Sequence, residues 1–261
     1  MFAHHRATIE RATEHFAALA ETRGILVGGS IAHGFETATS DVDLMIVVSD
    51  DDYALRRTSG DVTWVSAEIA TYPGGYVDAK YISMDLIRAV SARGSEPARF
   101  AFDSVIVALA RIPGLADLVR EASRYPSEER DGKVQRFRAQ LDAWHWYCRE
   151  ADRLKDPYLL SQAVPNLVLF AGRLILAHNE VLYPYHKWFL RVLADVPDKP
   201  AGLLDLIDQV VDRREPNAIA ELHGLVAGYA DWPDGGISWG ARFMLDTELA
   251  WLDGRAPVGD L

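Results

Sequence analysis

One stretch, VDLMIVV at residues 42–48, limits the folds open to this chain more than any other. A near-continuous apolar run of this length is typical of a strand buried within a sheet. The shorter run GILV at residues 24–27 has the same character and is followed by two glycines. We therefore expect both runs to be central strands of one sheet.

The rest of the chain predicts two domains. Residues 1–23 have the period of an amphipathic helix, and two β-rich segments, 61–72 and 76–83, flank the turn residues PGG and predict an antiparallel pair. Helical and strand-like patterns continue to about residue 125. Beyond it every strong pattern is helical. We predict an α+β fold: a catalytic domain with a mixed sheet over residues 1–125, and an all-α bundle, which would bind the acceptor, over residues 126–261.

Charge and composition narrow the partners. The chain of 261 residues has 38 Asp and Glu against 27 Lys and Arg, which disfavours nucleic acid and favours a small cationic substrate. The single Cys148 cannot form an internal disulfide, which fits the cytoplasm. The apolar stretch 163–178 contains Pro165 and Arg173 and is short for a bilayer, so we expect a buried helix and no membrane partner. The oligomeric state is left open.

Two aspartates stand at the entry of the 42–48 strand. Side chains two apart in a strand share one side, roughly 6 to 7 Å apart at their bases, so Asp41 and Asp43 can converge on one cation. Mg²⁺ is commonly held by one or two carboxylates together with the phosphates of a substrate. Upstream, Gly28, Gly29 and Ser30 connect a strand to a short helix, a geometry in which backbone N–H groups and a hydroxyl can bind phosphate.

This combination of a Gly-Ser turn, a short spacer and D-x-D resembles the signature of the nucleotidyltransferase superfamily, which includes DNA polymerase beta. With a helical domain after it, the chain looks most similar to the kanamycin or aminoglycoside type. The resemblance implies that Gly29 and Ser30 hold the phosphates of an NTP and that Asp41 and Asp43 hold two magnesium ions. It also implies that Ser40 assists with phosphate.

Members of this superfamily use a third carboxylate on a later strand. The resemblance assigns this role to Asp78, as a metal ligand or as the general base that activates the acceptor hydroxyl. Glu68, on the preceding predicted strand, is the reserve candidate. An acid on a strand can also simply face solvent, so this assignment depends on the resemblance.

The helical half offers candidates for substrate contacts. Lys187, near a predicted helix start, is in a position where relatives of this layout place a phosphate-binding lysine; a solvated lysine is the alternative. In the loop 227–240, Asp231 and Asp234 could pair with amines while Trp232 and Trp239 stack on a sugar or cation. An acidic surface loop with buried tryptophans is the alternative there.

The predicted activity is a Mg²⁺-dependent transfer of AMP, from ATP, to a hydroxyl of a small, aminoglycoside-like acceptor, with release of pyrophosphate. One alternative is a toxin-like enzyme that modifies tRNA, through a groove of Arg136, Arg138 and Arg149, or that modifies a protein. The other is a non-catalytic, antitoxin-like protein that binds nucleotide.

Two further patterns are interpreted as structural. The segments 138–145 and 173–178 have the Arg-to-His spacing of helical ribonuclease toxins, but neither arginine is directly followed by a polar residue. The adjacent His4 and His5 are expected to lie at a frayed terminus and to form no metal site.

Overall fold

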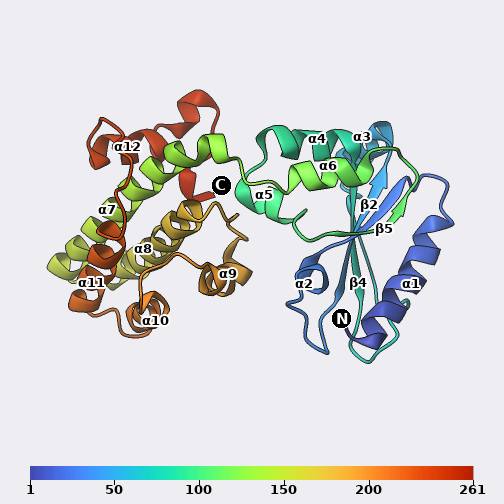
Figure 1. The fold of residues 1–261 in the computed structure, drawn as a ribbon, viewed down its shortest axis with the longest axis horizontal. Coiled ribbons are helices and arrows are strands. Elements are labelled where there is room, and N and C mark those ends of the chain that lie inside the picture. Colours follow the sequence, from blue (N-terminus) through green and yellow to red (C-terminus); the bar gives the residue numbers. More distant parts are fainter. Residues whose placement is uncertain (261) are drawn as a thin grey trace. The chain divides into compact units, whose positions relative to one another are not determined.

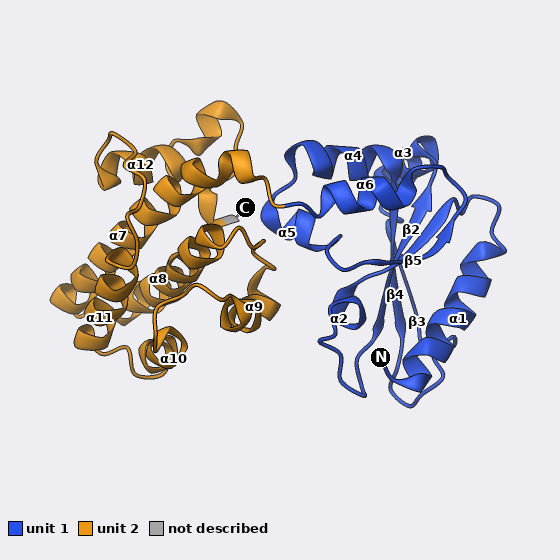
Figure 2. Cartoon of the chain, viewed as in Figure 1, with its two compact units in different colours: residues 1–124 blue, residues 125–261 orange. Residues whose placement is uncertain are grey.

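The computed structural model describes residues 1–260. The chain divides into two compact units, Met1–Arg124 and Tyr125–Leu261 (Figure 2). The boundary lies one residue before the one predicted. The first unit is a mixed sheet with helices and the second is helical, so the predicted α+β class is confirmed.

A five-stranded sheet forms the centre of the first unit (Figure 1). Its order is β3-β4-β2-β1-β5, in which only β2 and β4 are parallel. The predicted central strands, β1 and β2, are both interior. The strands are β1 Gly24–Val27, β2 Val42–Val48, β3 Thr63–Ser66, β4 Val77–Ser83 and β5 Ile106–Ala110.

Helices cover both faces of this sheet, because β2 presents apolar side chains on both of its faces. Leu44 and Ile46 pack on one face with Phe16 of α1, whereas Val47 packs on the other with Ile87 of α4. Helix α6 joins the second face through Leu115 and Val119. The helices of this unit are α1 Ala3–Ala17, α2 Gly29–Ala32, α3 Asp50–Ser59, α4 Met84–Arg93, α5 Glu96–Phe100 and α6 Leu115–Ala122.

The predicted strand over residues 61–72 is shorter than expected. Strand β3 pairs antiparallel with β4, as predicted, but ends at Ser66, whose hydroxyl accepts a hydrogen bond from the N–H of Glu68 at 3.1 Å. Farther on, Thr71 is held by hydrogen bonds to Thr8 of α1. These contacts draw the chain away from the sheet edge. Glu68 is therefore exposed in a loop, and its predicted position on a strand is wrong.

The N-terminus also differs from the prediction. Helix α1 begins at Ala3, and His5 is fully buried (0% exposed), so this end is not frayed. The rings of His4 and His5 lie 4.5 and 5.1 Å from the ring of Tyr72, measured between centroids. Aromatic packing across the 67–76 loop thus orders the first turn of the helix.

The second unit is built around two long helices, α7 Arg130–Leu154 and α8 Pro157–His178, which pack against each other. Four shorter helices surround them: α9 Phe189–Asp195, α10 Leu203–Arg213, α11 Pro216–Ala227 and α12 Trp239–Asp246. Within residues 125–260 the structure contains no strand, in agreement with the helical pattern of the sequence.

Helix α8 is a buried helix, as predicted, although the argument from its length was wrong. It begins at Pro157 and has 22 residues, and an 18-residue window within it has a mean hydropathy of 1.5, enough to cross a membrane by length and composition. Of that window, 67% is buried inside the protein. Its Arg173 is 2% exposed, donates to the carbonyl of Val258 at 3.0 Å and lies over the ring of Phe137. Such burial is typical of a core helix.

Candidate functional site

Two of the three predicted carboxylates lie side by side on neighbouring parallel strands. In the register of β2 and β4, Asp43 is the direct partner of Asp78. Neighbouring strands lie about 4.8 Å apart, so the two side chains, which leave equivalent positions of parallel strands, emerge side by side. Asp41 immediately precedes β2, and the N–H of Val42 donates to the carbonyl of Tyr76, just before β4, at 3.0 Å.

The glycine turn lies directly against this pair. The N–H of Gly28 donates to the carbonyl oxygen of Asp43 at 3.0 Å. Gly29 has a φ of +61°, and a Cβ atom there would overlap the Oδ2 atom of Asp43 and lie 2.8 Å from its Cβ. Only glycine allows both this backbone angle and this approach. The turn and the carboxylates therefore form a single site.

The two predicted phosphate-binding serines differ. Ser30 is the second residue of helix α2, is 4% exposed, and its Oγ atom has no hydrogen-bond partner among the described residues. A buried hydroxyl with an unmet hydrogen bond is suited to an anion at this turn. The hydroxyl of Ser40 instead accepts from the N–H of Thr37 at 2.9 Å and closes a local turn.

A tyrosine that the sequence analysis did not single out belongs to the site. The hydroxyl of Tyr76 donates a hydrogen bond to Asp41, which raises the pKa of Tyr76. The negative charges of Asp41, Asp43 and Asp78 raise it in the same direction, so this hydroxyl lies within the field of all three carboxylates. Nearby, the hydroxyl of Tyr72 donates to the carbonyl of Ser40. The only signal in the sequence is their position on either side of the PGG turn.

The metal assignment remains a prediction. Among residues 1–260, no group of three or more His, Cys, Asp and Glu side chains is arranged to hold a metal ion. The three predicted ligands therefore do not form a complete protein-only cage. Mg²⁺ usually needs only one or two carboxylates when substrate phosphates and water supply the remaining oxygens. Asp41 and Asp43 meet that smaller requirement.

The lysine predicted to bind phosphate belongs to the second unit. Lys187 lies in a short 3-10 helix, His186–Trp188, where it is exposed and its Nζ atom is 5.0 Å from the centre of the Trp188 ring. Its contact with a nucleotide stays a prediction. The neighbouring Tyr183 is buried, and its hydroxyl is 3.1 Å from Nδ1 of His186.

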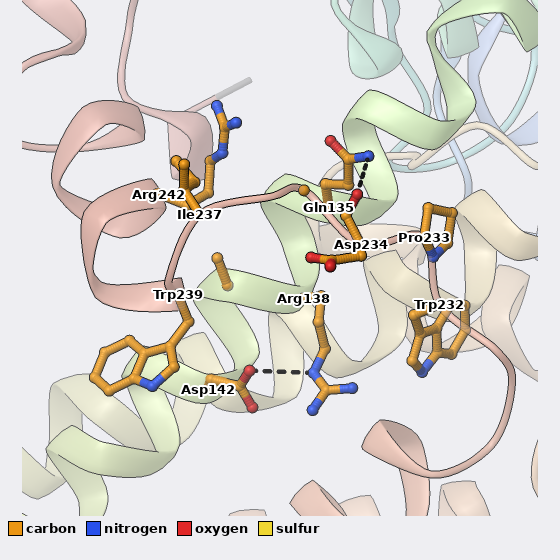
Figure 3. Close-up of a pocket in the computed structure, with 11 residues that line it drawn as sticks. Gln135, Arg138, Asp142, Trp232, Pro233, Asp234, Ile237, Trp239 and Arg242 are labelled. Carbon is orange, nitrogen blue, oxygen red and sulfur yellow. Dashed lines mark hydrogen bonds and ion pairs between the residues drawn. The ribbon is translucent and has the colours of Figure 1, made fainter.

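Three of the four predicted acceptor residues line one cavity in the second unit (Figure 3). Trp232, Asp234 and Trp239 surround a space of about 290 Å³ together with Arg138 and other residues of α7 and α12. The carboxylate of Asp234 accepts from the N–H of Gly236 at 3.0 Å, and the main-chain carbonyl of Asp234 accepts from Gln135 at 3.2 Å. The fourth, Asp231, does not line this cavity.

The basic groove considered for tRNA is not formed. Arg136 is paired with Asp246 at 3.1 Å, and Arg138 is paired with Asp142 at 3.2 Å. Arg149 lines a different cavity from Arg138. Carboxylates thus pair with two of the three arginines, which reduces the positive charge that they could offer to a phosphate backbone.

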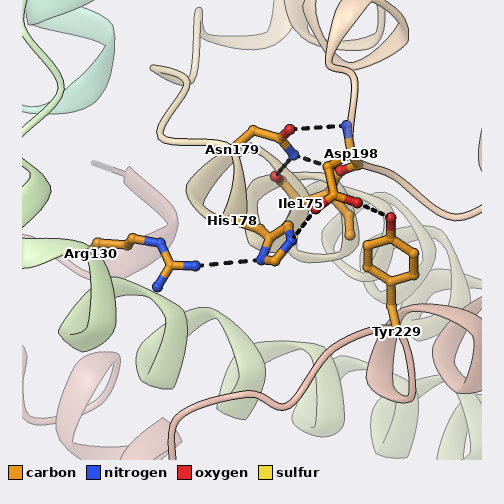
Figure 4. Close-up of polar contacts among 6 residues, drawn as sticks. All are labelled: Arg130, Ile175, His178, Asn179, Asp198 and Tyr229. Atoms are coloured by element: carbon orange, nitrogen blue, oxygen red, sulfur yellow. Dashed lines mark hydrogen bonds and ion pairs between the residues drawn. The ribbon is translucent and has the colours of Figure 1, made fainter.

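The second Arg-to-His segment ends in a structural network (Figure 4). Nε2 of His178 lies 2.7 Å from Oδ2 of Asp198, and Nδ1 lies 3.4 Å from the guanidinium of Arg130. The hydroxyl of Tyr229 also donates to Asp198. The side-chain amide of Asn179 donates to the carbonyl of Asp198 and accepts from its N–H. These contacts tie the end of α8 to the loop before α10 and to the end of α11, as expected for bundle residues.

The first Arg-to-His segment leads to a pH prediction. His145 stacks on His223, with ring centroids 4.1 Å apart, and His223 bonds Asp142 at 2.7 Å. Burial, with smaller contributions from the positive charges of the nearby His223 and Arg149, lowers the pKa of His145 to about 4. The unfolded chain therefore takes up this proton as the pH falls below about 6.5, while the folded chain resists until about 4.

We expect the free energy of unfolding to fall by about 2 kcal/mol between pH 7 and pH 4.5 on account of this ring, less than the full shift implies because the ring is partly exposed to water. His145→Gln should remove that part of the pH dependence, and His15→Gln, at an exposed position of α1, is the control. Denaturant unfolding at both pH values measures the difference. Equal pH dependence in the wild type and His145→Gln would contradict the assignment.

The chain resembles few known proteins at a level that can be detected. No characterised protein family and no curated protein matches the sequence. Among solved structures, the chain matches the crystal structure, at 1.90 Å resolution, of a nucleotidyltransferase-like protein from Exiguobacterium sibiricum 255-15. The two are 18% identical, the match covers 98% of this chain and 89% of that one, and the TM-score is 0.47. A likeness this distant does not bear on function or on site residues.

Proposed function

We propose that this chain is a Mg²⁺-dependent nucleotidyltransferase that moves a nucleoside monophosphate, AMP from ATP in the first instance, onto a hydroxyl of a small acceptor. One observation supports this most: the Gly28–Gly29 turn lies against the carboxylate of Asp43, which is abreast of Asp78 on the parallel strand. The backbone proposed to bind phosphate and the carboxylates proposed to bind metal are thereby adjacent, which supports nucleotidyl transfer.

Each residue of the site then has a role. The N–H groups of the turn and the Ser30 hydroxyl bind the β- and γ-phosphates. Asp78 accepts the proton of the acceptor hydroxyl, whose oxygen attacks the α-phosphorus. A bond forms between that oxygen and phosphorus, and the bond from phosphorus to the β-phosphate oxygen breaks. Pyrophosphate leaves with the electron pair of the broken bond.

Asp41 and Asp43 are the proposed ligands of magnesium, with two ions expected. Bound magnesium would neutralise the triphosphate and make the acceptor hydroxyl more acidic. Tyr76 holds the carboxylate of Asp41 through its hydroxyl and so limits the directions in which that ligand can turn. Lys187 is the proposed additional contact to the phosphates, and Ser40 contributes through the turn that precedes Asp41.

The proposed acceptor is small, hydroxylated and amine-bearing, similar to an aminoglycoside. The cavity lined by Trp232, Asp234 and Trp239 supports this, because indole faces suit sugar rings and a carboxylate suits an amine. The acidic balance of the chain, 38 acidic against 27 basic residues, favours the same class of acceptor.

The test is turnover with each of the four NTPs, magnesium, and a panel of aminoglycosides and other amino sugars. We expect pyrophosphate release that needs both magnesium and acceptor, and an acceptor whose mass rises by one nucleoside monophosphate unit. EDTA should abolish both signals. No release with any NTP, together with no magnesium-dependent nucleotide binding, would exclude the catalytic function.

A further inference from the structure

A second cavity of the helical unit has no part in the proposed reaction. It encloses about 650 Å³, within the range of 300 to 1,000 Å³ typical of small-molecule sites. Helix α7 supplies Cys148 and Arg149, α8 supplies Leu160, and α11 supplies Ile219. Arg214, directly after α10, completes it.

The floor of this cavity is apolar. Cys148 and Ile219 are each 3% exposed, and the half-buried Leu160 and the exposed Pro216 and Ala220 supply the rest of the apolar lining. Burial raises the pKa of the Cys148 thiol to about 12, so it behaves here as a small apolar group. A ligand would therefore gain by burying a hydrocarbon or aromatic body.

The rim of the cavity is positively charged. Two of its charged residues are already neutralised: Arg153 pairs with Glu150 at 2.6 Å, and Asp152 pairs with Lys155 at 2.9 Å. Arg149 and Arg214 remain, and within residues 1–260 neither guanidinium has a hydrogen bond or an ion pair. The chain has a formal net charge of −11, so two arginines without a carboxylate partner beside an apolar floor form a locally positive site in an acidic protein.

We propose that this cavity binds a small amphipathic organic acid, with its carboxylate on Arg149 and Arg214 and its apolar body over Ile219 and Cys148. Guanidinium groups bind carboxylates through paired N–H···O bonds, which gives the head a defined place. His145, which also lines the cavity, is stacked on His223. The inference does not depend on the proposed catalysis, because binding needs neither nucleotide nor metal.

A pair of fluorescent probes tests this directly. One is 1-anilinonaphthalene-8-sulfonate, and the other is N-phenyl-1-naphthylamine, which has the same rings without the anion. We expect Arg149→Gln and Arg214→Gln each to raise the Kd of the anionic probe about tenfold and to change that of the neutral probe less than twofold. Ala220→Trp, which fills the cavity, should weaken both probes.

Arg213→Gln is the matched control, because Arg213 is adjacent to Arg214 and does not line the cavity. It should leave both Kd values unchanged. Octanoate should displace the anionic probe, whereas inorganic phosphate and octylamine at equal concentration should not. Displacement by phosphate alone, equal effects of the arginine variants on both probes, or an effect of Arg213→Gln as large as that of Arg214→Gln would each overturn the proposal.

Discussion

Asp43→Asn is expected to lower the rate of nucleotidyl transfer about a thousandfold while the protein stays folded. The substitution keeps the size of the side chain but removes one charge from the position where β2, β4 and the glycine turn meet. Loss of one anionic ligand forfeits several kcal/mol of charge stabilisation, and each 1.4 kcal/mol is about a factor of ten in rate.

Stability should respond in the opposite direction. Asp41, Asp43 and Asp78 act together on the hydroxyl of Tyr76, so three like charges lie near one another when no cation is bound. Removing one of them should leave the free energy of unfolding unchanged or raise it by up to about 1 kcal/mol. A residue with a purely structural role would instead lower it.

Asp51→Asn serves as the control for Asp43→Asn, because it removes the same charge from an exposed residue in the first turn of α3. It should leave turnover within twofold of the wild type. Turnover measured with magnesium at saturating nucleotide, beside denaturant unfolding without metal, separates the two effects. Wild-type turnover in Asp43→Asn would show that the metal assignment is wrong, even if the enzyme class is right.

Local patterns were enough to predict much of the first unit. Apolar runs at 24–27 and 42–48 identified interior strands, since such runs have no polar face to give to solvent. That the glycine turn and Asp43 belong to one site was expected from the resemblance to the nucleotidyltransferase signature. The register that pairs Asp43 with Asp78 could not be read locally, because it depends on how two strands more than thirty residues apart align.

The misplaced residues have a common cause. Glu68 was assigned to a strand by β-propensity, but the hydroxyl of Ser66 turned the backbone, and Thr71 was drawn to α1. Tyr76 was overlooked, and His5 was wrongly expected at a frayed terminus, because their partners, Asp41 and Tyr72, are distant in sequence. Contacts of this kind between chain segments decide burial and pKa, and single-sequence periodicity does not contain them.

The cavities of the helical unit illustrate the same limit. Composition marked the loop 227–240 as a candidate for acceptor binding, but it did not indicate that Arg138 of α7 lines the same cavity as Trp232 and Trp239. Arg149 was grouped with Arg136 and Arg138 because the three are close in sequence. On a helix, however, residues eleven and thirteen positions apart lie on different turns, and the structure directs Arg138 and Arg149 into separate cavities.

Gly29→Ala is expected to damage both stability and activity. The substitution places an L side chain at φ +61°, which costs about 1 to 2 kcal/mol, and its Cβ must displace the carboxylate of Asp43. Forced repacking at so close a contact adds about 1 to 3 kcal/mol. We expect the free energy of unfolding to fall by about 3 kcal/mol and turnover to fall at least a hundredfold, because Asp43 can no longer lie against the turn.

Gly34→Ala separates the two contributions. Gly34 has a φ of +69°, close to that of Gly29, but no atom lies within 4 Å of the position its Cβ would take. The free energy of unfolding of Gly34→Ala should therefore fall only by the cost of the backbone conformation, about 1 to 2 kcal/mol, and its turnover should be unchanged. Since both glycines belong to the same segment between β1 and β2, the difference between the two variants measures the contact with Asp43 alone. Equal losses of stability and activity in both would mean that the turn and the carboxylate do not act as one site.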